Sequence, residues 1–289
     1  MRISDVSTGY SLISQLQKLK ASEVDLQKKL VTGKQVDSVA DDPALGASLL
    51  NSQVEREKLI QQNDNSALAS NIAQGGIDAL SHISDNIDLA ISVAESAQSD
   101  GSTVVASEID NVINSVLSAA NTKYGDDYIF GGTASASSPF ALDAASGRYV
   151  YNGSGNGRQM EVADGVTVSP FSSDESNKAI LSALNTLLDL KSAIASGDST
   201  AIASAADSLD AGQDDITAAS AELGTTQARL ELIDTRNAAR YSNLDDAEES
   251  ATNSDENEIT VKLLAVQNAY SASLQGSAML LQKSILDYL

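Results

Sequence analysis

The chain has 289 residues, 40 acidic against 18 basic side chains, a formal net charge of −22, one histidine and no cysteine. This charge repels nucleic acid and anionic membranes, and the missing thiols exclude disulfides and thiolate metal sites. The charge is uneven, because residues 1–60 hold eight bases and eight acids and the whole excess lies in residues 61–289. With few aromatics and three prolines, the composition favours long helices with small-residue seams.

The first helix is predicted over residues 8–31, where leucines recur at alternating three- and four-residue steps and Glu23 fills the one gap. These seam positions are Leu12, Leu16, Leu19, Leu26 and Leu30. Thr32-Gly33 ends the helix, because glycine accepts the left-handed closing conformation. After a loop, Asp42-Pro43 starts the next helix with a capping carboxylate and a proline at the first position.

A long helical pattern then runs from Pro43 to about Gln98, with Gly75-Gly76 as an expected weak point. A shorter helix follows over about 105–123. From Tyr124 the pattern changes to turn-bounded, β-branched segments, which predict a β-rich insertion over about 126–172. Its expected strands are 148–151, 158–162 and 166–168, and Asp164-Gly165 is placed for a two-residue hairpin turn.

Helix returns after Ser172 and stops near Gly197. A seven-residue seam continues from Ile202 to Leu244, and polar Asn237 and Arg240 at seam positions are predicted to set its register. The acidic run over 245–258 is interpreted as a solvated helix face. The last helix begins at Ile259, and its apolar positions are Leu263, Val266, Tyr270, Leu274, Leu281, Ile285 and Tyr288.

The predicted fold is mainly α with a small β domain, and its two ends pair as an antiparallel coiled coil. The expected domains are a terminal coiled coil with its loop (1–42 and 259–289), a helical rod (43–125 and 173–258) and an outer β domain (126–172). Each end carries one apolar stripe and no second face. We therefore expect neighbouring subunits to cover these seams and to order the ends on assembly.

Little in the chain suggests catalysis. The single histidine, His82, lies one turn from seam positions and is interpreted as an ordinary helix residue. Asp126-Asp127 falls in a predicted turn, and Gly153, Gly155 and Gly157 precede a strand rather than a helix, which favours a flexible turn over a nucleotide site. We predict no enzyme activity, cofactor or metal. A coiled-coil signalling or adhesin module is a further alternative.

Three stretches resemble the bacterial flagellin superfamily, and the second and third are similar to its hook–filament junction proteins. The matching words are Thr32–Lys34 with Val36 and Ala40–Pro43; Asn121–Tyr124 with Tyr128–Thr133, Pro139-Phe140 and Tyr151–Gly153; and Asn268–Leu274 with Ser284–Leu289. The motif residues among them are Gly33, Asp41, Asp42, Pro43, Phe130, Gly131 and Asp287.

The resemblance implies a structural subunit that joins the hook, through hook-associated protein 1, to the flagellin filament. It implies a ring of copies, a cytoplasmic export chaperone and export by the flagellar type III apparatus. The first thirty residues lack the apolar core of a secretory signal, which fits that route. The alternative is a short flagellin that forms the filament itself. In either case the apolar positions of the two terminal helices are the expected assembly interface.

Overall fold

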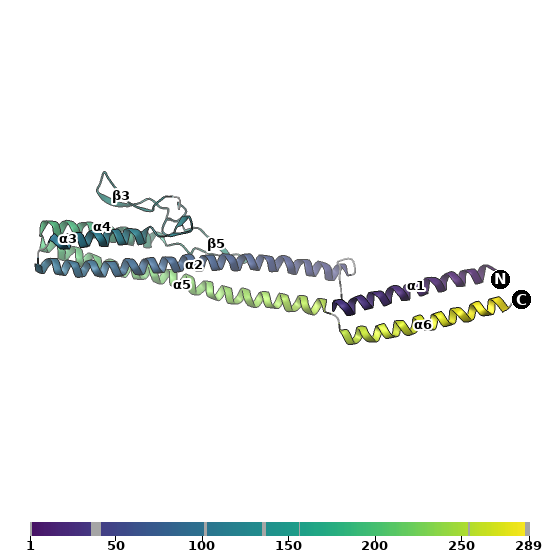
Figure 1. Ribbon diagram of the computed structural model, residues 1–289. Coiled ribbons are helices and arrows are strands. Elements are labelled where there is room, and N and C mark those ends of the chain that lie inside the picture. Colours follow the sequence, from purple (N-terminus) through teal and green to yellow (C-terminus); the bar gives the residue numbers. More distant parts are fainter. Residues whose placement is uncertain are drawn as a thin grey trace. The chain divides into compact units, whose positions relative to one another are not determined.

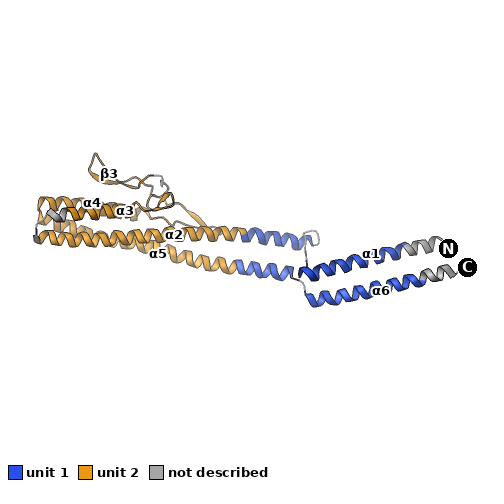
Figure 2. Cartoon of the chain, viewed as in Figure 1, with its two compact units in different colours: residues 1–56, 241–289 blue, residues 57–240 orange. Residues whose placement is uncertain are grey.

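The computed structural model describes residues 2–35, 42–100, 103–134, 137–155, 157–253 and 255–286 (Figure 1). The chain divides into two compact units, and Figure 2 colours them separately. Unit 1 contains residues 1–56 and 241–289, and unit 2 contains residues 57–240. The domain boundaries expected from composition fall at other residues and stay a prediction.

Helices dominate the described chain, which confirms the predicted mainly α class with a small β insertion. Their bounds are α1 Arg2–Thr32, α2 Pro43–Asp100, α3 Thr103–Ala120, α4 Asp174–Ser196, α5 Ser199–Thr252 and α6 Glu256–Leu286. The start and stop signals act as predicted. Asp42 accepts hydrogen bonds from the backbone N–H groups of Ala44 and Leu45 at 3.0 and 3.1 Å. Gly33 has a φ of 68° and donates its N–H to the Lys29 carbonyl at 2.9 Å.

Unit 2 is built around one apolar core to which α2, α3, α4 and α5 all contribute. Its fully buried members include Leu80, Ile83 and Ile87 of α2, Ile109 and Val116 of α3, Leu184 and Leu187 of α4, and Leu209 and Ile216 of α5. Four amphipathic helices that share one core can hide their apolar stripes completely from water.

The prediction of a weak point at Gly75-Gly76 is wrong, because α2 continues through both residues. A Cβ on Gly76 would lie 2.7 Å from Leu223 Cδ1, and one on Gly75 would lie 3.0 Å from Ile129 Cδ1. These glycines therefore allow close packing of the core against α2, which is a role that helical spacing alone does not reveal.

The β insertion consists of three separate antiparallel hairpins. They pair β1 Lys123–Tyr124 with β2 Asp127–Tyr128, β3 Phe140–Asp143 with β4 Arg148–Tyr151, and β5 Met160–Ala163 with β6 Val166–Val168. Strands β4 and β6 have the predicted bounds, whereas β5 begins two residues later than expected. The turn at Asp164-Gly165 is confirmed, and Gly165 has a φ of 66°.

The second hairpin is anchored to the helical core through Tyr151. Its phenol donates to the Phe130 carbonyl at 2.9 Å and accepts from Asn177 Nδ2 of α4 at 2.9 Å. Its ring packs on Phe140 with centroids 5.2 Å apart. Burial raises the pKa of Tyr151 to about 12, so the phenol remains a neutral donor.

The third hairpin, β5–β6, packs against unit 2 segments of α2 and α5. Asn237 Nδ2 of α5 donates to the Val162 carbonyl at 3.0 Å, and Asn65 Nδ2 of α2 donates to the Glu161 carbonyl at 2.9 Å. A small apolar cluster that includes Ala69, Val162 and Leu230 lies beneath. The prediction that Asn237 sets the register of a helical seam is therefore wrong, because its buried amide satisfies a strand carbonyl instead.

Asp164, at the tip of this hairpin, attaches the hairpin to the helices through ion pairs. The carboxylate pairs with Lys58 of α2, accepts from Gln62 Nε2 at 3.2 Å and pairs with Arg240 Nη1 of α5 at 3.1 Å. The Lys58 ammonium, then Gln62 and Arg240, hold the pKa of Asp164 at about 2. The prediction that Arg240 sets the register of the helical seam is therefore wrong as well, because its guanidinium pairs with the hairpin.

Candidate assembly surface

The two terminal helices pair with each other inside unit 1. Helices α1 and α6 lie side by side (Figure 1). Gln267 Nε2 donates to Glu23 Oε1 at 3.2 Å, and the Lys20 ammonium lies 5.9 Å from the centre of the Tyr270 ring. At the base of the pair, Lys34 bridges Asn253 in antiparallel sense. The antiparallel pairing predicted for the ends is therefore confirmed.

The predicted seam residues form one half-buried stripe on each helix. On α1 these are Leu12, Leu16, Leu19, Leu26 and Leu30, and on α6 they are Leu263, Val266 and Tyr270. Leu274 departs from the stripe with 45% of its surface exposed, while Ser273 and Ser277 are half-buried. The side chains of Leu281 and Ile285, and all of Tyr288, lie outside the described part of the chain.

Apolar side chains are also exposed at other positions of these two helices, and we call this set the outer stripe. Its members are Tyr10, Ile13, Val24 and Val31 on α1, and Val261, Leu264, Leu274 and Met279 on α6. Val24 is 54% exposed and Val31 is 87% exposed. The expectation of a single apolar stripe is therefore wrong for α1, whose exposed members recur on one face, whereas the four on α6 do not all keep helical spacing. The seven-residue steps from Tyr10 through Gln17 to Val24 and Val31 were the sequence signal for it.

The motif residues have structural roles where the structure describes them. Gly33 and Asp42-Pro43 end and start helices, as given above. Phe130 is fully buried in the unit 2 core, and Gly131 donates its N–H to the Tyr128 carbonyl at 3.1 Å. Asp41 and Asp287 lie outside the described residues. The described motif residues thus end or start helices, pack in the core or form a turn.

The acidic run of α5 meets one base of α2 within unit 1. Arg56 Nη1 pairs with Glu248 Oε2 at 2.7 Å, and Arg56 Nη2 donates to the Tyr241 hydroxyl at 2.8 Å. The hydrogen bond to Tyr241, followed by that to Glu248, raises the pKa of Arg56 above its usual value. Asp246 and Glu249 are exposed, as expected for a solvated face.

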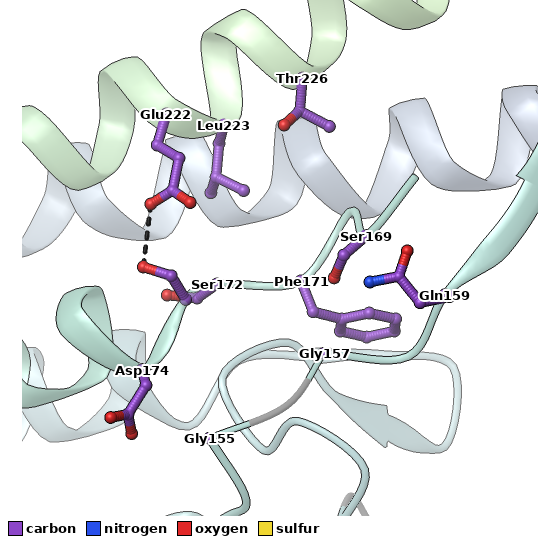
Figure 3. A pocket seen from close by; sticks show the side chains of 11 residues that line it. Gly155, Gly157, Gln159, Ser169, Phe171, Ser172, Asp174, Glu222, Leu223 and Thr226 are labelled. Carbon is purple, nitrogen blue, oxygen red and sulfur yellow. Dashed lines mark hydrogen bonds between the residues drawn. The ribbon is translucent and has the colours of Figure 1, made fainter. Parts of the chain in front are cut away.

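A pocket of about 400 Å³ lies in unit 2 between α5 and the segment that leads into α4 (Figure 3). Its charged groups have partners. Glu222 accepts from the Ser173 hydroxyl at 2.9 Å, and Asp174 pairs with Lys178 at 2.5 Å. His82 is exposed elsewhere, on α2, with Asn86 bonded to its backbone carbonyl. The only histidine therefore lies outside this pocket, whose carboxylates already have hydrogen-bond or ion-pair partners.

Within the described ranges, no three His, Cys, Asp or Glu side chains gather as metal ligands would. The same ranges contain no helix with the length and apolarity needed to cross a bilayer. Apolar side chains are exposed on both helices of the α1–α6 pair, which makes this pair the candidate contact surface.

A protein-family model matches the N-terminal part of the chain. Residues 3–135 match the family model described as the bacterial flagellin N-terminal helical region. The chain is therefore flagellin-like over this part, which confirms the resemblance in its sequence. A search of curated proteins found no match.

Solved structures narrow the fold further. The chain is similar to a flagellar hook-associated protein from Vibrio parahaemolyticus (TM-score 0.65, 19% identity, covering 74% of this chain and 100% of that one). It is similar to FlgL from Bacillus cereus (TM-score 0.55, 22% identity, covering 63% of this chain and 97% of that one). It is also similar to the flagellar junction protein FlgL from Legionella pneumophila (TM-score 0.51, 14% identity, covering 73% of this chain and 100% of that one). At these identities the likeness establishes a shared fold.

Proposed function

We propose that this chain is a structural subunit of the bacterial flagellum that joins the hook, through hook-associated protein 1, to the flagellin filament. The observation that carries the proposal is the combination of a flagellin-type N-terminal region with the fold of a flagellar junction protein over nearly the whole length of that relative. A short flagellin is the alternative, and the junction-type fold matches favour the main reading.

The outer stripe supplies the contact surface that such a subunit needs. In the free chain the leucine seam of α1 is already half covered by α6, so the exposed side chains of the outer stripe remain for neighbours. We propose that Val24, Val31, Leu264 and Met279 pack against further copies and against the adjoining flagellar proteins. Burial of each such side chain contributes on the order of 1.5–3 kcal/mol, which adds up along two helices of this length.

The proposal also includes the chemistry, assembly and export of the subunit. We propose that it works without catalysis, metal or cofactor, in a ring of copies in the extracellular flagellum. It would reach that place through the flagellar type III apparatus with help from a cytoplasmic chaperone. The proposed domain plan places the β insertion of residues 126–172 on the outside.

A clean deletion strain tests the proposal. We expect hooks without filaments and flagellin shed into the medium, with filaments restored by the wild-type gene. Val24→Asp should fail to restore filaments, because it places a charge in the packed face. Leu142→Asp, an equally exposed apolar position on β3, is the matched control and should restore them.

Two outcomes would contradict the proposal. Normal filaments on the deletion strain would exclude a junction role. Labelled protein found along the filament in flagellin-like numbers, rather than at its base, would establish the alternative of a short flagellin.

A further inference from the structure

Glu23 is the one described side chain of α1 that is buried, with 9% of its surface exposed. It occupies the single gap in the leucine seam, where each neighbouring seam position is a half-buried leucine. Carboxylates are rarely buried unless donors surround them. A carboxylate at the best-covered position of a marginal two-helix seam therefore requires an explanation other than packing.

The donors around Glu23 come from both helices. Gln267 Nε2 of α6 donates to Oε1 at 3.2 Å across the seam. From its own helix, Lys20 Nζ pairs with Oε2 at 3.0 Å and Gln27 Nε2 donates to Oε1 at 3.4 Å. These bonds, led by that from Lys20, lower the pKa of Glu23. Glu23, Lys20, Gln27 and Gln267 together form what we call the polar layer.

A leucine seam tolerates displacement by one heptad, because it presents the same side chains after seven residues. The polar layer does not. With Glu23 level with Gln267, a shift of seven residues would bring Glu23 level with Leu274, which has no donor, or with Thr260. The Thr260 hydroxyl already donates to the Glu256 carbonyl at 2.7 Å. In either shifted register the carboxylate would lose its bond from α6.

The polar layer lies away from the base of the α1–α6 pair. At the base, the pairing is fixed by the Gln35 N–H, which donates to the Thr252 carbonyl at 2.7 Å. Glu23 lies nine residues from the end of α1 at Thr32, about 14 Å at 1.5 Å per residue. Beyond it, α6 presents Ser273 and Ser277 to the seam, whereas α1 still presents Leu12 and Leu16. Apolar contact is therefore weakest where an incorrect partner could most easily replace α6.

We propose that the polar layer selects the partner and register of α1, so that α1 pairs with α6 of its own chain in one antiparallel alignment. The layer gives up some apolar contact in exchange for this selectivity, as single polar residues do in coiled-coil cores. The inference does not depend on the proposed function, because it concerns pairing within the free chain.

The test uses the full-length chain with spin labels on cysteines placed at Ser22 and Asn268, both exposed. The chain has no natural cysteine, so the labels report only these positions. Wild type and Glu23→Gln, which keeps an amide partner for Gln267, should give one distance between the labels. The double variant Glu23→Leu, Gln267→Leu should add a second, longer distance, because a slip of one heptad moves the two labels about 10 Å apart along the axis, or a signal that disappears on dilution with unlabelled chain.

Melting of the α1–α6 pair separates selectivity from simple packing. The double leucine variant should melt at the same temperature as wild type or higher, while its pairing becomes mixed. Leu19→Ala is the control and should melt earlier with its single distance retained. A double variant that keeps the single wild-type distance at every dilution would overturn the proposal, and so would one that merely melts earlier.

Discussion

Unit 2 and the α1–α6 pair of unit 1 use similar helical patterns with different results. In unit 2, four helices share a core whose central side chains are fully buried. In the terminal pair, the same kind of leucine seam is only half-buried, and the outer stripe remains exposed. Two helices bury one face each, whereas four close a core around all of their apolar stripes.

This difference shows where the chain is complete and where it requires partners. Unit 2 buries the centre of its own core completely, and its glycines admit Leu223 and Ile129 close to α2, although Leu89 and Leu232 remain exposed on its surface. The terminal pair leaves apolar residues exposed on both helices. Residues 1–60, which include α1, also have no net charge. We therefore expect changes in unit 2 to affect folding and changes in the terminal pair to affect association.

The largest effect should come from removing a core leucine. Leu187→Ala should lower the free energy of unfolding of unit 2 by about 3 kcal/mol, because it leaves a cavity at a site with no exposure. Leu19→Ala, in the half-buried seam, should leave the unfolding of unit 2 unchanged. Denaturant titration with a probe in unit 2 measures both. Equal effects of the two variants on that probe would mean that the units fold as one, and the comparison would fail.

The sequence predicted the elements of both regions better than it predicted their surroundings. Helix starts and stops followed from local chemistry, as at Asp42 and Gly33, because caps depend on neighbouring backbone groups. Two-residue turns such as Asp164-Gly165 were equally local. A strand could be expected only where its residues alternated clearly, and those of β3 at Phe140–Asp143 do not.

Contacts between distant segments were the part that spacing could not supply. Asn237 and Arg240 occupy positions typical of a helical seam, yet a hairpin about 75 residues away satisfies them. The exposed side of the terminal helices was missed for a related reason. The leucines form the stronger seven-residue stripe on α1 and the exposed residues a weaker one, and only the position of α6 shows which of the two is covered.

A middle-sized effect should distinguish glycines that are packed from glycines that are not. Gly212→Ala in α5 should stabilise unit 2 by about 1 kcal/mol, because alanine favours helix and no atom lies within 4 Å of the new methyl group. Gly76→Ala should fall about 2 kcal/mol short of that gain, because buried Leu223 must move. Thermal unfolding of the two variants measures the difference. A gain of equal size at Gly76 would show that the close approach to α2 carries no strain.

The smallest effect should appear where unit 2 holds its β5–β6 hairpin by charge. The folded pKa of Asp164, about 2, lies below the ordinary aspartate value of 3.8, so the carboxylate stabilises the docked hairpin above about pH 4. That contribution is lost as the pH falls through 2. Amides of Val162 and Val166 should therefore exchange faster in Asp164→Asn than in wild type at neutral pH, and the difference should vanish near pH 2.

Lys58→Met removes the first cause of the shift and should raise the Asp164 pKa toward 3.8 in a carboxyl-carbon NMR titration. Lys262→Met, which breaks an exposed pair with Glu258 in α6, is the control and should leave the Asp164 titration unchanged. A wild-type midpoint already near 3.8 would mean that the apolar cluster beneath the hairpin, and not the charges at its tip, holds it to the helices.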